Sequence, residues 1–379
     1  MIPIAKPYIT ELEAQAAYET ILTGWITQGP KVAEFEEKFA NYVGSKYAVA
    51  VSNCTTALHL SMIVAGIGEN DEVICPSMSY IATANCIKYV NAIPVFAEID
   101  PKTLNLDIND VKHRITNKTK AILLVHQVGF PADIDAFQNL CNQNGLKLIE
   151  DAACAIGSEY KGKKIGSHSD LVCFSFHPRK VITTGDGGMV ATSNKEYCDR
   201  LKLLRQHGMS INDRVRHESK TVIFEEHVEI GYNYRMTDIQ ASVGIKQLES
   251  LDWIIDERRK IAFFYTEKFK ELVNISLPSE IEDTFSNFQS YSIFLKPECP
   301  ISRNELMEKM LEAGIATRRG IMTIHRELAY KDLNGIETLS ISEDTSDRSI
   351  ILPLYVGIQN SELEYIVNVF KELTTGINC

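Results

Sequence analysis

The stretch Ala121-Ile122-Leu123-Leu124-Val125-His126 is a short apolar run, and Leu146-Lys147-Leu148-Ile149-Glu150 is the next one along the chain. Between them, Ala132–Asn144 has the spacing of an amphipathic helix. Short runs that are apolar on both faces are typical of strands in a sheet that is covered on both sides. Similar runs occur at Tyr47–Val51, Glu72–Cys75, Pro94–Ile99, Leu171–Phe176 and Gly188–Thr192, with another helical pattern at Thr55–Ala65. The alternation predicts a three-layer α/β fold with a predominantly parallel sheet.

The segments on either side of this region have a different character. Before it, residues 13–22 and 31–42 have helical spacing. After residue 194 we expect helices at 196–207, 237–272, 303–313 and 361–373, a long loop at 208–230 and a strand at 289–295. We therefore predict a large α/β domain over residues 1–245 and a small α+β domain over residues 246–379. The first twelve residues are expected to pack on the small domain.

Composition excludes several classes of protein. The net charge of −11 is unsuited to nucleic acid, which needs a basic face. No apolar run approaches the roughly 18 residues of a membrane span, and the N-terminus lacks the pattern of a signal peptide. The nine cysteines have neither a CxxC pair nor zinc-ligand spacing, so we expect no metal site and reduced thiols in the cytoplasm.

Two polar motifs follow predicted strands, where open α/β sheets bind their ligands. The first, Ser52-Asn53-Cys54-Thr55-Thr56, leads into a helix. Free N–H groups and hydroxyls there suit a phosphate, although an ordinary helix cap has the same residues. The second is Glu150-Asp151-Ala152-Ala153. A carboxylate at that position could hold a protonated ring nitrogen, or could be a helix cap or a surface acid.

Two further motifs lie beyond these. Ser175-Phe176-His177-Pro178-Arg179-Lys180 leads into a glycine-rich turn at 185–188. A lysine beside so many small residues could enter a cavity and form a Schiff base, its pKa lowered by burial or by neighbouring charge, whereas most lysines are solvated. The last motif, Gly231-Tyr232-Asn233-Tyr234-Arg235-Met236, precedes a helix and could be its start. A phosphate cradle, a ring-nitrogen acid and a Schiff-base lysine are together what pyridoxal phosphate (PLP) requires.

These motifs together resemble the DegT/DnrJ/EryC1/StrS sugar-nucleotide aminotransferases over nearly the whole chain. The resemblance begins at Trp25-Ile26-Thr27-Gln28-Gly29-Pro30 and ends at Gly314-Ile315-Ala316-Thr317-Arg318. It implies the type I PLP fold of aspartate aminotransferase. It makes Lys180 the catalytic lysine and Asp151 the partner of the pyridine nitrogen. It also implies further cofactor contacts from Thr55, the backbone at Thr56, Tyr80, Ser175 and, across a homodimer with shared active sites, Asn233.

Some positions depart from the family pattern. Cys54 replaces a glycine, Asp186 a glutamate, and Cys154 a glutamine that bonds the phenolic oxygen of the cofactor. A thiol is a weak donor, so that contact changes. Because Lys180 is not replaced by the histidine of the related dehydratases, the resemblance favours amino transfer.

The resemblance also implies the substrates, glutamate as amino donor and a nucleotide-linked 4-keto-6-deoxy sugar as acceptor. The residues expected at the sugar nucleotide are Trp25, Thr27, His177, Arg235, Arg318, Arg319 and His325. The stretch 317–320 resembles relatives that aminate C4, and we expect a dTDP-sugar. The alternatives are a C3 aminotransferase, an enzyme for GDP- or UDP-sugars, a PLP sugar dehydratase, and a non-catalytic protein that keeps the fold.

Overall fold

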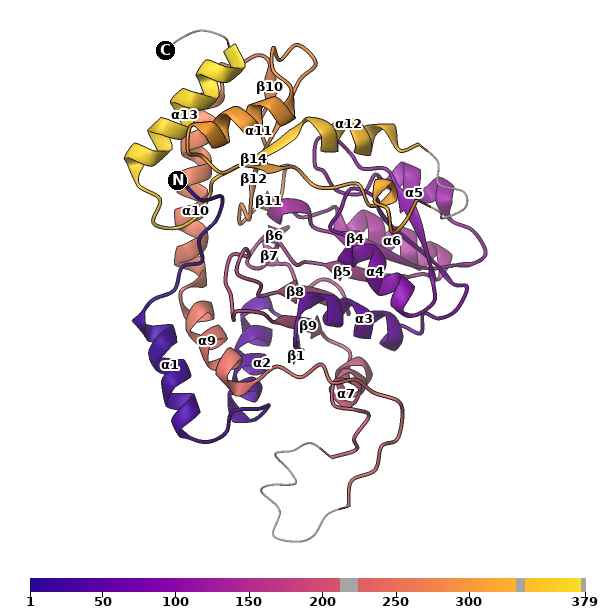
Figure 1. Cartoon of the computed structure of the whole chain (residues 1–379). Helices are drawn as coiled ribbons and strands as arrows, with labels where there is room; N and C mark the ends of the chain where they lie inside the picture. Colours follow the sequence, from indigo (N-terminus) through magenta and orange to yellow (C-terminus); the bar gives the residue numbers. More distant parts are fainter. Residues whose placement is uncertain (212–223, 332–337, 376–379) are drawn as a thin grey trace.

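A seven-stranded sheet forms the centre of the large α/β region in the computed structural model, which describes residues 1–211, 224–331 and 338–375 (Figure 1). Its strand order is β1-β9-β8-β5-β4-β2-β3, and only β9 runs antiparallel to its neighbours. The strands are β1 (Tyr47–Val51), β2 (Glu72–Pro76), β3 (Ile93–Ala97), β4 (Thr119–Val125), β5 (Lys147–Asp151), β8 (Val172–Ser175) and β9 (Gly188–Thr192). The predicted parallel α/β sheet is confirmed, because each of its seven strands lies within two residues of a predicted run.

Helices cover both faces of this sheet. One face packs against α2 (Pro30–Val43), α9 (Asp238–Glu249), α5 (Ile108–Arg114) and α6 (Ile134–Asn144). The other face packs against α3 (Cys54–Val64), α4 (Ala82–Tyr89) and α7 (Lys195–Leu204). Helix α1 (Glu11–Leu22) lies alongside α9 (Figure 1). None of the described helices is long and apolar enough to span a membrane.

A smaller unit is built around an antiparallel sheet of order β10-β12-β14-β13. Helices α10 (Leu251–Phe269), α11 (Arg303–Glu312) and α13 (Asn360–Thr375) enclose its core. Its strands are β10 (Ile275–Ser276), β12 (Tyr291–Leu295), β13 (Arg318–Arg319) and β14 (Ser349–Leu352). The remaining elements are α12 (Ser340–Arg348), the 3-10 helices at Gln127–Gly129 and Ile324–Arg326, and the small sheet of β6 (Glu159–Tyr160), β7 (Lys163–Lys164) and β11 (Thr284–Phe285).

The helix-prone stretch predicted at 237–272 is helical, and it forms two helices, α9 and α10, that meet at Ser250. The Ser250 N–H donates to the carbonyl of Gln247, three residues back, at 3.2 Å. After this tighter turn, α10 begins in the core of the large sheet and ends in that of the small sheet. Because α10 belongs to both cores, the boundary predicted at residue 245 stays a prediction.

Two segments of the large unit lie outside its sheet and helices, the N-terminal residues and the described part of the loop predicted at 208–230. Ile2 forms a bridge to Ile315 of the small unit, the region to which we assigned the first residues. Most of the loop predicted at 208–230 lies outside the described residues, but Met209 pairs with His227 where the loop leaves the body of the molecule (Figure 1).

Candidate active site

A cavity of about 730 Å³ opens at the carboxyl ends of the parallel strands, between the large sheet and strands β13 and β14. This is where an α/β sheet places its ligands. Ten of the residues predicted for the site line this cavity, namely Thr55, Thr56, Tyr80, Asp151, Cys154, Ser175, His177, Lys180, Arg318 and Arg319.

One end of the cavity is the N-terminus of α3. The Asn53 side chain caps the helix, because its Oδ1 accepts from the Thr56 N–H at 2.9 Å. The Thr56 N–H is therefore already used, whereas the N–H groups of Cys54 and Thr55 occupy the first two positions of the helix, which lack intrahelical acceptors. The interpretation as a helix cap is confirmed. The interpretation as a phosphate site stays a prediction, now resting on the N–H groups of Cys54 and Thr55.

Gly188 allows strand β9 to pass close to this helix start. A Cβ at this position would lie 2.4 Å from the carbonyl carbon of Asn53 and 2.7 Å from the nitrogen of Cys54. The same residue pairs with Val51 and with Ser175 on the neighbouring strands. The glycine-rich turn is thus required by close approach of backbones at the phosphate end of the cavity.

Asp151 ends strand β5 with its carboxylate buried. Its oxygens accept from the Thr83 hydroxyl at 3.0 Å and from the Ala153 N–H at 3.1 Å. Burial raises the pKa of this carboxyl above its ordinary value, although Ala153, Lys180 and Thr83 act in the opposite direction. A buried carboxylate of this kind is stabilised by a cationic partner, which a protonated ring nitrogen provides.

Lys180 projects into the same cavity, and its Nζ donates to Cys154 Sγ at 3.1 Å. Burial acts to lower the pKa of the amine, but Cys154 and Asp151 outweigh it and hold the pKa above its ordinary value. The lowered pKa expected from the sequence is therefore wrong for the chain as it stands. The reason is the negative groups around the amine.

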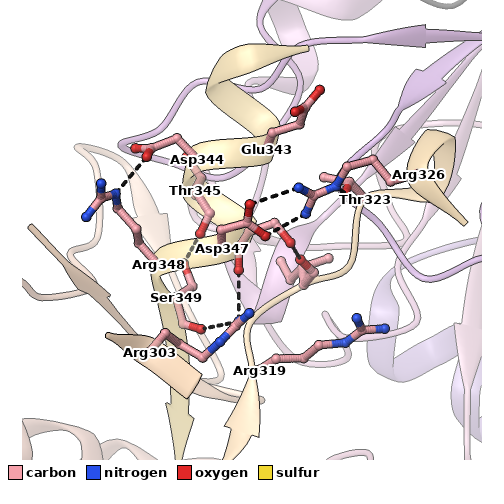
Figure 2. Close-up of polar contacts among 12 residues, drawn as sticks. Arg303, Arg319, Thr323, Arg326, Glu343, Asp344, Thr345, Asp347, Arg348 and Ser349 are labelled. Carbon is pink, nitrogen blue, oxygen red and sulfur yellow. Dashed lines mark hydrogen bonds and ion pairs between the residues drawn. The ribbon is translucent and has the colours of Figure 1, made fainter. Parts of the chain in front are cut away.

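The two arginines of β13 both line the cavity, but their side chains lie on opposite faces of the strand. Arg318 pairs with Ile351, which lines the cavity, and Arg319 pairs with Ile350, which is buried in the small core. Because cross-strand partners project to the same face, the Arg318 side chain lies on the cavity side. Figure 2 shows Arg319 with the cluster around Asp347, where Arg326 donates to both carboxylate oxygens at 2.8 and 2.6 Å.

Four of the predicted residues lie outside the cavity. Trp25 donates from its indole to the Gln28 carbonyl at 3.2 Å, and Thr27 is exposed. Asn233 is exposed, and Arg235 is likewise absent from the cavity wall. Tyr232 and Tyr234 stack at 4.9 Å and pack on His59, so Asn233 between them projects away from that cluster.

His325 also lies outside the cavity, and both of its ring nitrogens have partners. Nδ1 bonds the Ser77 hydroxyl, and Nε2 lies 3.0 Å from a carboxylate oxygen of Glu343. The Ile324 N–H donates to the Ser77 carbonyl at 2.8 Å. The histidine thus joins the end of β2 to α12 and holds the wall formed by residues 320–322, and its predicted contact with a sugar stays a prediction.

Three residues near the cofactor end were missed from the sequence. Thr83 holds Asp151, Asn287 holds the Cys154 backbone, and Tyr89 lines the cavity. Thr83 and Tyr89 belong to α4, a helix of eight residues whose periodicity is too short to detect. Asn287 comes from a loop, where the residue type alone carries no signal.

Comparison with known proteins identifies the family. The model of the DegT/DnrJ/EryC1/StrS aminotransferase family matches residues 7–371. The chain belongs to this family. It is 37% identical to a GDP-perosamine synthase of Escherichia coli O157:H7 and 36% identical to one of Vibrio cholerae, each match covering 98% of both chains.

Solved structures agree with this assignment. A putative sugar aminotransferase of Streptococcus pneumoniae in its PMP form superposes with a TM-score of 0.94, at 28% identity over 99% of this chain and all of the other. PseC of Helicobacter pylori, an aminotransferase involved in the biosynthesis of pseudoaminic acid, gives 0.92 at 27% identity over the same shares. The chain is therefore a PLP-dependent sugar aminotransferase with the type I fold, and both resemblance and fold class are confirmed.

The residues of the cavity fit this cofactor. The α3 N-terminus and Ser175 suit its phosphate, Asp151 suits its ring nitrogen, and Lys180 suits its aldehyde, with Gly188 leaving the space. When bound, PLP supplies the aldehyde and an electron-withdrawing ring that stabilises negative charge on a substrate carbon. The protein would supply the anion site, the buried acid and a lysine amine that can move protons.

Proposed function

We propose that this aminotransferase transfers the amino group of glutamate to C4 of a GDP-linked 4-keto-6-deoxy sugar. The observation that carries the proposal is the cavity itself, where Lys180 and Asp151 share one enclosure with Arg318 on its far wall. A guanidinium in the same cavity as the lysine suits the diphosphate of a nucleotide sugar, because arginine binds phosphate oxygens in a bidentate way. The names of the curated relatives favour GDP over the dTDP expected from the sequence.

A direct experiment tests the substrate and the reaction together. The purified enzyme is incubated with ¹⁵N-glutamate and, in separate reactions, GDP-, dTDP- and UDP-4-keto-6-deoxyhexose. We expect the label in the GDP-sugar product, located at C4 by NMR, together with release of 2-oxoglutarate. Label at C3 would reject the assigned carbon, preference for dTDP or UDP would reject the nucleotide, and deoxygenation without nitrogen transfer would identify a dehydratase.

We also infer a homodimer in which each active site takes residues from both subunits. Trp25, Thr27 and Asn233 match family positions at the substrate or the cofactor, and Arg235 is a candidate for the diphosphate. All four lie outside the cavity of their own chain. The outward projection of Asn233 supports its use by a second copy. The soluble-domain composition and reduced cysteines are consistent with action in the cytoplasm, where nucleotide sugars would be its substrates.

A further inference from the structure

The hydrogen bond between Lys180 and Cys154 places a thiol beside the reacting amine. Lys180 Nζ and Cys154 Sγ are 3.1 Å apart. The two residues come from different parts of the sheet, because Cys154 follows β5 and Lys180 follows β8. Cys154 occupies a position where the resemblance to the family implies a glutamine. The thiol differs from an amide in one chemical respect, because it can release and accept a proton.

The position of the sulfur is fixed by its backbone. Asn287 Nδ2 donates to the carbonyls of Cys154 at 2.9 Å and Ile156 at 2.8 Å. Asn287 is buried against Gly129, where a Cβ would lie only 2.1 Å from its Oδ1. The loop that carries Cys154 is therefore held by the small unit, and the sulfur stays within reach of the amine.

Charged and titratable groups surround this pair on each side. Asp151 and Cys54 interact electrostatically with the Lys180 amine, and so does His177. On the other side, the buried Arg258 interacts electrostatically with Cys154, while its own N–H groups donate to carbonyls of Phe288, Gln289 and Leu354. The sulfur of Cys154 thus has a basic side chain on each side, Lys180 and Arg258.

We propose that Cys154 shares a proton with Lys180 whenever the lysine is not bonded to the cofactor. The proton moves between Nζ and Sγ: one N–H bond breaks as one S–H bond forms, and an ammonium–thiolate pair becomes an amine–thiol pair. No other reactant is needed. An ordinary thiol is roughly 100-fold more acidic than a lysine ammonium, which favours the charged pair in water, whereas burial favours the neutral pair.

This sharing gives Lys180 its function as a base. A general base must be neutral before it takes a proton from the substrate, and Cys154 holds the proton that the amine must lose. The pair as a whole keeps the same number of protons, so the neutral amine is available without a change in pH. The inference rests on the PLP chemistry of the family and is independent of which sugar the enzyme uses.

The first test measures the thiolate directly in the pyridoxamine form of the holoenzyme, where the lysine is free. The rate of carbamidomethylation of Cys154 by iodoacetamide is followed by peptide mass spectrometry as a function of pH, in the wild type and in Lys180→Ala loaded with pyridoxamine phosphate. Because only the thiolate is nucleophilic, we expect Cys154 to react at least about 10-fold faster at neutral pH when Lys180 is present. Equal rates in the two proteins at every pH would overturn the proposal.

The second test separates proton sharing from simple positioning. The hydroxyl of a serine at position 154 can still accept a hydrogen bond from Nζ. It is too weak an acid to ionise, so it cannot exchange a proton with the amine. We expect the wild-type half-reaction with glutamate to be nearly independent of pH around neutrality, and that of Cys154→Ser to rise with pH. Cys299→Ser, at a partly exposed cysteine of the small unit, is the matched control and should keep the wild-type profile. A wild-type profile in Cys154→Ser would reduce the thiol to a positioning contact and overturn the proposal.

Discussion

Replacing Gly188 with alanine should damage the phosphate end of the active site. The new Cβ would lie 2.4 Å from the Asn53 carbonyl carbon and 2.5 Å from its oxygen, well inside the 3.0 Å that real Cβ atoms keep. Strand β9 is paired on both sides at this residue, so the start of α3 must move instead. Overpacking of this kind costs about 1–3 kcal/mol, or roughly 5- to 150-fold in an equilibrium constant. We expect the loss mainly in PLP affinity, because the displaced N–H groups are those that face the anion.

The assay is a PLP titration followed by absorbance, combined with thermal unfolding of the cofactor-free protein. Gly68→Ala is the matched control, because its Cβ would meet no atom within 4 Å. If Gly188→Ala binds PLP as tightly as the wild type, the α3 N-terminus does not bind the phosphate. A loss of unfolding free energy with unchanged PLP affinity would lead to the same conclusion.

Further substitutions test the other parts of the site. Lys180→Ala should lower turnover by at least the roughly 10²–10⁴-fold of a general acid–base group while the fold is kept, which steady-state kinetics and circular dichroism will check. Asp151→Asn should slow amino transfer. It should also raise the melting temperature of the cofactor-free protein at neutral pH, but not in acid. The pKa of Asp151 is raised in the folded protein, so its ionised carboxylate is destabilising, and this cost grows as pH rises from the unfolded-state pKa to the folded-state pKa. Asn233→Ala should weaken PLP binding by about 1.5–3 kcal/mol. A mixed dimer with Asn233→Ala in one subunit and Lys180→Ala in the other should keep about half the wild-type activity at sub-saturating PLP, because both substitutions then affect the same site. Clearly lower activity would place Asn233 in its own subunit's site. Arg318→Gln should raise the KM for the nucleotide sugar by at least about 10-fold, the effect of losing one charge-assisted contact, whereas Arg319→Gln should change it little; equal effects would contradict the assignment of the two side chains to opposite faces of β13.

The cofactor end of the site could be predicted from the sequence because parallel strands share an edge. Asp151 and Lys180 each follow a buried strand, and strands β5 and β8 are neighbours in the sheet. A pattern of short apolar runs therefore suffices to bring their ends together, without knowledge of any side-chain contact. Thr55 follows β1, at the edge of the same sheet, and lies close because β9 brings Gly188 against the helix start.

The substrate end could not be predicted in the same way. Strands β13 and β14 have two and four residues, too few to give a period, so the sequence leaves open which of Arg318 and Arg319 turns toward the cavity. The register with Ile350 and Ile351 decides it. The contact between Asn287 and Cys154 joins residues 133 positions apart and depends on how the small unit sits on the large one.

The charges of the cavity connect the cofactor with the order of events at Lys180. Without a cofactor, burial raises the pKa of Asp151, and neighbouring negative groups raise that of Lys180. The first shift reflects the loss of solvent around a buried carboxyl, and the second reflects the negative groups around the amine. A protonated ring nitrogen supplies the missing cation beside Asp151, so it removes part of the attraction that holds the proton on Lys180. Binding of the cofactor thus loosens the proton on the amine, and Cys154, whose Sγ lies 3.1 Å from Nζ, is placed to share it.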